Sequence, residues 1–217
     1  MNLILVARSA DRLEEVAEHI RQVADVEVEV LPADLSQAEG TLRVCERLID
    51  DERPVGLLVN NAGFGLGQDF VGGDIERELN ALNVMVRAVL MTCHAAIPGM
   101  VARGGGGILN IASMAALTAQ GTYSAHKAWV RTFTEGLAAS LRGTGVNATV
   151  VCPGLVHTEF HEKVDVDPGQ WPESAFIPAE RVAAEAIEGV RRGKVVVTPS
   201  RRYRALAGAL KVAPRSL

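Results

Sequence analysis

Short apolar runs alternate along the chain with longer segments in which apolar residues recur at helical spacing. The short runs predict strands, and the first of them, "NLILVA", is apolar after its first residue, as expected of a buried strand. The predicted strands are Asn2–Ala7, Val26–Leu35, Val55–Gly63, Gly106–Ser113, Val146–Gly154 and Lys194–Pro199.

The longer segments predict helices between these strands. They are Asp11–Val23, Ser36–Asp51, Asp74–Ala102, Thr122–Arg142 and Pro178–Arg192, and a basic helix follows near the end of the chain. Ser36 precedes Glu39 by three residues, which is the spacing of a capping box. Pro98 and Gly99 are expected to end or kink the helix that contains them.

This alternation predicts an α/β fold, a doubly wound parallel sheet with crossover helices on both faces. Ligands of such sheets bind beyond the carboxyl ends of the strands. Asp34, Asn60, Ser113 and Pro153 stand at or just past such ends. We therefore expect one site along this edge of the sheet.

The size and charge of the chain narrow its function class. Its 217 residues predict a single domain large enough to bury a substantial core. Aromatic residues make up only 4 %, so Ala, Val and Leu must do most of the packing. The formal net charge of −4 argues against a general nucleic-acid-binding protein, for which a basic excess is expected.

The cysteines and the apolar runs predict a cytoplasmic protein. Cys45, Cys93 and Cys152 are widely spaced and follow no disulfide or metal pattern, so we expect reduced thiols. No apolar run approaches the roughly 18 residues of a membrane span. The N-terminal apolar stretch has no basic region before it and no cleavage site after it, so it does not predict a signal peptide.

"TYSAHKAW" places Tyr123 four residues before Lys127, on one face of a predicted helix. A phenol has an unperturbed pKa near ~10, and a nearby cation favours its ionised form. The pair could therefore be an acid/base device. The alternative is two surface residues on an ordinary helix.

Three other features carry weaker hypotheses. His157 and His161 are four apart, but no Cys or carboxylate cluster accompanies them, so we expect no metal site. The segment Leu155–Glu173 is irregular and is expected to cover a substrate. The C-terminal "SRRYRALAGALK" could contact a membrane or a partner, although a solvated surface helix is the favoured interpretation.

Taken in order, the motifs of this chain resemble those of the short-chain dehydrogenase/reductase family. "ADL" ends a strand at Asp34 and Leu35, and "NNAG" follows the next strand. "LNVMVRAV" carries Asn83, "NIAS" ends at Ser113, and "YSAHK" and "PG" come later in the chain. Ser113 and Tyr123 are ten residues apart, a few fewer than in many relatives, and Ala112 replaces a common second serine.

The resemblance implies a Rossmann-type sheet and hydride transfer between NADP(H) and a carbonyl or alcohol substrate. The apolar, irregular segment Leu155–Glu173 is consistent with a substrate of apolar character. It implies catalytic roles for Tyr123 as the general acid, for Ser113 as the residue that holds the carbonyl oxygen, for Lys127 in lowering the pKa of Tyr123, and for Asn83 in holding a water near Lys127. The residues that it implies for cofactor binding are Asp34, Leu35, Asn60, Ala62, Gly63, Tyr123, Lys127, Pro153, Gly154 and Thr158.

Other readings of single residues remain open. Asn60 could simply form a turn, Asp34 could cap the next helix, and Asn83 could be an exposed helical residue.

Arg8 bears on the choice of cofactor. It follows the first strand, where NADP-preferring relatives place a basic residue against the adenosine 2′-phosphate. The alternative is a solvated charge at a strand end. The resemblance also implies a homo-oligomer built through helices Asp74–Ala102 and Thr122–Arg142, with Trp129 and Phe133 one turn apart on the second helix.

The resemblance begins at the family's second strand, and this raises a second hypothesis. Neither "NAGFGLGQ" nor "RGGGGI" is placed like the family's Gly-rich turn, whose backbone N–H groups hold the pyrophosphate. A central strand is expected to be missing between Asn2–Ala7 and Val55–Asn60. The sequence thus suggests an N-terminally shortened Rossmann domain, and the alternative to an active enzyme is a protein of this fold without redox activity.

Overall fold

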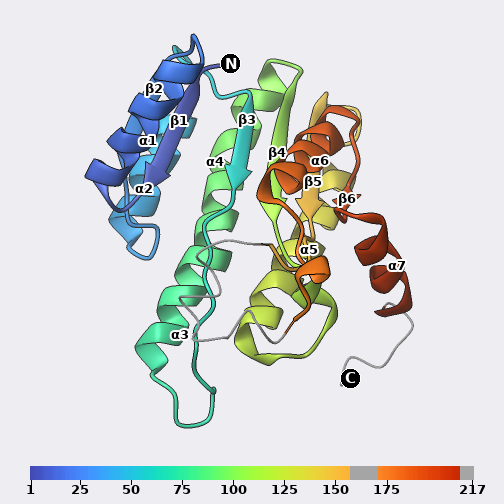
Figure 1. The fold of residues 1–217 in the computed structure, drawn as a ribbon. Coiled ribbons are helices and arrows are strands. Elements are labelled where there is room, and N and C mark those ends of the chain that lie inside the picture. Colours follow the sequence, from blue (N-terminus) through green and yellow to red (C-terminus); the bar gives the residue numbers. More distant parts are fainter. Residues whose placement is uncertain (157–170, 211–217) are drawn as a thin grey trace.

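The computed structural model describes residues 1–156 and 171–210, which form an α/β fold with parallel strands (Figure 1). The strands are β1 (Leu3–Ala7), β2 (Val28–Pro32), β3 (Leu57–Asn60), β4 (Gly106–Ile111), β5 (Val146–Val151) and β6 (Val196–Val197). The main helices are α1 (Ala10–Val23), α2 (Ala38–Leu48), α3 (Ile75–Leu82), α4 (Ala88–Ala102), α5 (Gly121–Ser140), α6 (Ala179–Arg191) and α7 (Arg201–Leu210). Short helical turns are η1 (Asn83–Arg87, a π-helix), η2 (Met114–Leu117) and η5 (Glu173–Ala175).

The strands form two sheets rather than one. β1 pairs with β2, and β3, β4, β5 and β6 pair in that order. Within the described residues, β1 and β3 have no partner strand on the edges that face one another. The break lies where the sequence predicted a missing central strand, and Figure 1 shows the β1 and β3 arrows pointing the same way across it.

The core of the larger sheet lies against helices on both faces. On one face, Ile108 of β4 and Val146 of β5 pack with Cys93 and Met100 of α4. On the other face, Leu109 and Val151 pack with α6, at residues that include Ala186 and Val190. Gly107 lets α6 approach closely, since a Cβ there would lie 2.8 Å from a Val190 methyl group. This packing holds the carboxyl ends of β3, β4 and β5 at one edge.

The helix expected at Asp74–Ala102 is present as Ile75–Ala102. Asp74 caps it, because its carboxylate accepts from the backbone N–H of Glu76 at 2.9 Å. The helix then passes through the π-helical turn η1 and continues through Pro98 to Ala102, so Pro98 does not end it. Proline removes one backbone hydrogen bond, and the packing of residues such as the fully buried Met100 is enough to keep this helix continuous.

The same continuous helix bears on the expectation that the chain has no membrane span. Ile75–Ala102 is long and apolar enough to cross a membrane, by length and composition alone. In this fold, 44 % of its apolar window is buried within the protein. A core helix of a soluble domain meets the same criteria, so the helix is weak evidence for a span.

Candidate active site

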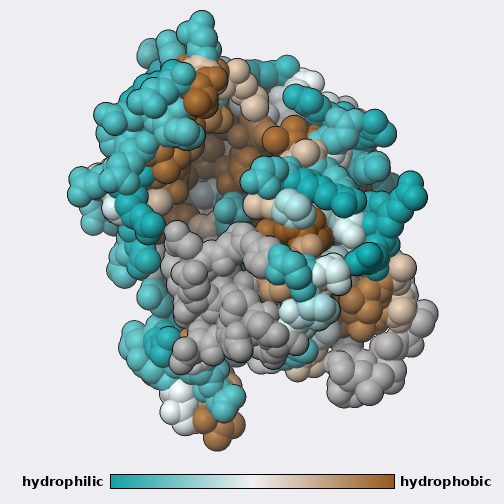
Figure 2. All heavy atoms as spheres, in the orientation of Figure 1, coloured by the Kyte–Doolittle hydropathy of each residue, from teal (hydrophilic) through white to brown (hydrophobic). Residues whose placement is uncertain are grey.

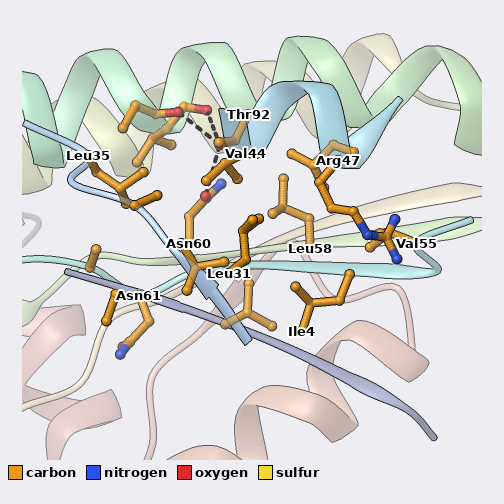
Figure 3. A pocket seen from close by; sticks show the side chains of 18 of the residues that line it. Ile4, Leu31, Leu35, Val44, Arg47, Val55, Leu58, Asn60, Asn61 and Thr92 are labelled. Atoms are coloured by element: carbon orange, nitrogen blue, oxygen red, sulfur yellow. Dashed lines mark hydrogen bonds between the residues drawn. The ribbon is translucent and has the colours of Figure 1, made fainter. Parts of the chain in front are cut away.

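A cavity of about 1530 Å³ separates the two sheets and continues past the strand ends. Figure 2 shows it as a hollow lined by apolar residues, and Figure 3 shows Ile4, Leu31, Val44 and Leu58 around it. Six of the residues that the sequence assigned to the cofactor line its wall: Arg8, Asp34, Leu35, Asn60, Ala62 and Gly63. The structure therefore brings the predicted cofactor residues from β1, β2 and β3 to one cavity.

At the end of β2, Asp34 organises the turn into α2. Its carboxylate accepts from the Ser36 hydroxyl at 2.7 Å and from the Ser36 backbone N–H at 2.9 Å. These bonds hold the pKa of Asp34 below its usual range, and the Arg8 guanidinium adds a smaller effect in the same direction. The predicted capping box is wrong, because Ser36 is engaged by Asp34 and α2 begins after Gln37 without a side-chain cap.

Asn83 takes a position other than the expected one. It opens the π-helical turn, and its side-chain amide donates to the Ser36 carbonyl at 3.1 Å. The side chain thus ties this turn to the end of β2 and not to Lys127. The wider backbone turn of a π-helix accounts for a direction that helical periodicity does not predict.

The Asn60 side chain lies in a polar network beneath the cavity wall. It donates to Asn110 Oδ1 at 2.8 Å and accepts from the Thr92 hydroxyl at 2.9 Å, as Figure 3 shows for Thr92. Asn110 in turn donates to Thr134 at 2.9 Å, and both of these residues are fully buried. The network joins β3, β4, α4 and α5. Asn60 thus supports the cavity wall through both the nitrogen and the oxygen of its side-chain amide.

Sequence reasoning missed Asn110, although a signal was present. An asparagine in the apolar run "GGILNIAS" has no reason to be buried unless its amide is paired.

The predicted catalytic residues meet at the end of β4 and the start of α5. Lys127 is only 4 % exposed, and its Nζ donates to the Ile111 carbonyl at 2.9 Å. Nζ lies 5.7 Å from the centre of the Tyr123 ring, and Tyr123 is hydrogen-bonded to Ser113. A Cβ on Gly63 would lie 3.1 Å from the same Nζ, so the turn after β3 reaches this cluster. The three side chains thus adjoin the cavity wall.

The electrostatics of the pair correct one expectation. Burial raises the pKa of Tyr123 to about 12, and the hydrogen bond from Ser113 opposes this only in part. Burial also lowers the pKa of Lys127 to about 8. Lys127 was expected to lower the pKa of Tyr123, but burial holds this pKa above its ordinary value, and the Lys127 ammonium donates to the Ile111 carbonyl. Near pH 7 the phenol is therefore neutral and can act as an acid.

A buried carboxylate that sequence reasoning missed holds the start of α5. Glu78 of α3 is 9 % exposed and accepts from the Thr122 hydroxyl at 2.7 Å and from Gln68 at 3.1 Å. These bonds keep the pKa of Glu78 below its usual range, with the bond from Thr122 the larger cause. Thr122 immediately precedes Tyr123, so this contact fixes the helix start that carries the phenol. The sequence gives no sign that Glu78 is buried, because it is one of several polar residues in an amphipathic helix.

After β5, the backbone carbonyl of Pro153 accepts from the Met114 N–H at 2.8 Å, directly after Ser113 in the sequence. Gly154 follows, and a Cβ there would overlap the ring of Tyr203. Thr158, His157 and His161 lie outside the described residues. Among the residues that are described, no three His, Cys, Asp or Glu side chains form a group that could hold a metal ion.

The residues present fit a nicotinamide dinucleotide. Arg8 and Asp34 at the strand ends and Gly63 in the turn after β3 line the same cavity, and Lys127 lies against Gly63 with Tyr123 beside it. A neutral phenol hydrogen-bonded to a hydroxyl, with a buried ammonium nearby, can deliver a proton to an oxygen atom.

Comparison with known proteins identifies the family of the chain. Residues 1–168 match the short chain dehydrogenase family. An uncharacterised oxidoreductase of Staphylococcus saprophyticus is 32 % identical over 185 residues, which are 81 % of this chain and 79 % of that protein. Sulfoacetaldehyde reductase 2 of Chromohalobacter salexigens is 34 % identical over 164 residues, which are 73 % of this chain and 64 % of that protein.

Solved structures give the same result. A short-chain dehydrogenase from Sphingobium yanoikuyae in complex with NADPH superposes with a TM-score of 0.87 at 30 % identity, covering 97 % of this chain and 84 % of that one. The chain therefore belongs to the short-chain dehydrogenase family, and it is an oxidoreductase that transfers a hydride with a nicotinamide cofactor.

Proposed function

We propose that this oxidoreductase uses NADP(H) to reduce carbonyl compounds, or to oxidise the matching alcohols, with Tyr123 as the residue that moves the proton. One observation carries the proposal. Tyr123 is hydrogen-bonded to Ser113 at the cavity end where Lys127 adjoins the Gly63 turn. A bound nicotinamide supplies the hydride or accepts it.

The chain itself handles the substrate oxygen and its proton. During reduction, negative charge develops on the carbonyl oxygen, and the neutral Tyr123 phenol donates its proton there. The Ser113 hydroxyl donates a second hydrogen bond that holds the same oxygen. The Lys127 ammonium lies close enough to favour the tyrosinate that forms. In alcohol oxidation Tyr123 takes the proton back.

The preference for NADP(H) rests on Arg8. Its side chain is exposed at the cavity wall, and a guanidinium there can pair with a 2′-phosphate. Two relatives in the same family support this choice: the Sphingobium dehydrogenase was solved with NADPH, and so was L-sorbose reductase from Gluconobacter frateurii, at 26 % identity.

A bulky, apolar substrate is the class that we favour. A 7β-hydroxysteroid dehydrogenase and a bulky-bulky ketone specific alcohol dehydrogenase from Comamonas testosteroni are each 25 % identical to this chain. A panel that contrasts diaryl ketones and steroid ketones with short aldehydes would distinguish these classes. Faster turnover of the short aldehydes would contradict this choice.

We also propose that the working sheet contains one further parallel strand between β1 and β3. Both edges that face the gap are open within the described residues, and unpaired buried backbone groups are costly. Val59 of β3 is 47 % exposed, although it lies in an apolar strand. Fusing a designed strand, Gly-rich turn and helix so that the strand can pair with both β1 and β3 should raise the melting temperature and tighten NADPH binding. No gain from the fusion would contradict the proposal.

We further propose a cytoplasmic homo-oligomer. The three cysteines are free thiols, as a reducing compartment permits. Trp129 and Phe133 of α5 stack with ring centroids 4.8 Å apart, and both also pack against the core of their own chain. Leu79 and Leu90, on α3 and α4, remain exposed. Light scattering at micromolar concentration should give a dimer or tetramer, and a monomer would count against this assignment.

Cofactor binding separates the enzyme from a protein of this fold without redox activity. Saturation at 100-fold above Kd stabilises a protein by about 2.7 kcal/mol, which a thermal-shift measurement detects. We expect NADPH to raise the melting temperature and NADH to do so less. The absence of a shift with either cofactor would favour the non-redox alternative.

A further inference from the structure

Tyr203 of α7 joins two chain segments that are distant in the sequence. Its hydroxyl donates to the Ala175 carbonyl at 2.9 Å and accepts from the Leu155 N–H at 3.2 Å. These two backbone groups stand before and after the undescribed residues 157–170. Leu155 also accepts from the Ile177 N–H at 2.9 Å, and Val156 pairs with Ile177. One phenol thus joins both segments.

The ring of Tyr203 also explains the glycine next to Pro153. A Cβ on Gly154 would overlap the Cζ and Cε atoms of this ring. Gly154 is not among the glycines with φ in the left-handed region, so its backbone conformation does not require glycine. The close approach of the ring does require it. The "PG" dipeptide is therefore matched to a side chain nearly fifty residues later.

The placement of α7 is specified by more than this contact. Ser200, at the start of α7, has φ = 72°, and it is the one residue other than glycine with positive φ in the described chain. Such a conformation persists only where surrounding contacts enforce it. Arg204 pairs with Glu185 of α6 at 3.3 Å, and Arg202 donates to the Ser174 carbonyl at 3.1 Å.

The turn that Tyr203 holds is bonded directly to the catalytic segment. The carbonyl of Pro153 accepts from the Met114 N–H, and Met114 follows Ser113. α7 also packs against η2, the turn that begins at Met114. We propose that Tyr203 is a positioning residue, which fixes the Pro153–Leu155 turn and, through Met114, the position of Ser113. Its effect on turnover rests on the proposed function, whereas its effect on the turn does not.

The experiment compares Tyr203→Phe with Arg202→Ala in the full chain. The phenylalanine keeps the ring on Gly154 and deletes both hydrogen bonds of the hydroxyl. The alanine removes a neighbouring α7 contact to the same 173–175 segment and leaves Gly154 untouched. We expect Tyr203→Phe to speed amide hydrogen exchange at Met114 and Leu155 by about tenfold, and Arg202→Ala to leave both rates unchanged. Equal rates in both variants would overturn the positioning role.

A double-mutant cycle tests the ring contact. Gly154→Ala should lower the melting temperature by roughly 5 °C or more, because overpacking is costly. In the Tyr203→Ala background the same substitution should cost little. An equal loss in both backgrounds would show that something other than the ring excludes a side chain at position 154, and it would overturn the inference.

Steady-state kinetics test whether the contacts of Tyr203 affect the reaction. Tyr203→Phe should lower kcat for carbonyl reduction several-fold, because Ser113 holds the substrate oxygen, while Arg202→Ala should not. If the wild-type chain failed to bind NADPH, the proposed function would fail. The hydrogen-exchange rates and the double-mutant cycle would still decide the structural role of Tyr203. If exchange at Met114 changed and kcat did not, the Tyr203 contacts would be structural only and the positioning role of Tyr203 in the reaction would be refuted.

Discussion

Lys127 donates its hydrogen bond to the Ile111 carbonyl, at 2.9 Å, and its ammonium lies in a buried position beside the Gly63 turn. The bond holds the lysine between the end of β4 and the turn after β3. A buried amine with a single carbonyl acceptor is poorly compensated for the loss of water, which is why its pKa falls to about 8. Two pH effects follow from this arrangement.

The first pH effect is on stability. Lys127 has a folded pKa near 8, below its ordinary value of 10.5, so between these values the unfolded chain binds more protons. The free energy of unfolding should therefore gain a contribution from Lys127 as the pH rises from about 8 towards 10. Urea unfolding of the wild type and of Lys127→Met across this range measures it. The same pH dependence in both proteins would contradict the assignment.

The second pH effect is on reduction. The pKa of Tyr123 near 12 keeps the phenol protonated far above neutral pH, whereas Lys127 loses its charge near pH 8. Under the proposed mechanism, kcat/KM for reduction should fall above about pH 8, because the neutral amine no longer favours the tyrosinate. A pH profile that stays flat to pH 10 would show that the charge of Lys127 is not required.

The Asn110 network predicts a large loss of stability. Asn110→Leu removes one hydrogen bond each from Asn60 and Thr134, and a buried polar group that loses a partner costs about 1–3 kcal/mol. We expect a total loss of roughly 2–5 kcal/mol in chemical unfolding. Asn147→Ala is the matched control, because Asn147 lies on neighbouring β5 and is exposed. A loss at Asn110 no greater than that at Asn147 would refute the role of the network.

Arg8 should determine cofactor preference. Arg8→Asp places a carboxylate against the proposed 2′-phosphate, so the ratio of kcat/KM for NADPH to that for NADH should fall at least tenfold. Arg12→Asp makes the same change of charge on α1, at a residue that does not line the cavity. If both variants shifted the ratio alike, the effect would come from net charge and not from a contact.

Much of the fold followed from periodicity and strand-end chemistry. The apolar runs located β1, β3, β4 and β5. The cluster of Ser113, Tyr123 and Lys127 lies where the end of β4 meets the start of α5. The break beside β1 lies where a missing strand was expected.

The remaining features depend on tertiary contacts that a linear pattern does not encode. The direction of the Asn83 side chain is set by a π-helical turn. The Ser36 hydroxyl donates to the Asp34 carboxylate and therefore does not cap α2. The pKa of Tyr123 is raised by burial, which the four-residue spacing to Lys127 does not predict. Glycine at position 154 reflects Tyr203, which lies on another element.

The central claim is that Tyr123 transfers the proton, and one substitution tests it directly. Tyr123→Phe deletes only the hydroxyl, so the fold and NADPH binding should persist while NADPH-dependent carbonyl reduction falls by about 10²–10⁴-fold. The measurement is steady-state NADPH oxidation with the best ketone of the panel, for wild type and variant, alongside the NADPH dissociation constant of each. A large loss of kcat with an unchanged dissociation constant is the predicted result, and reduction at the wild-type rate in the phenylalanine variant would contradict the account.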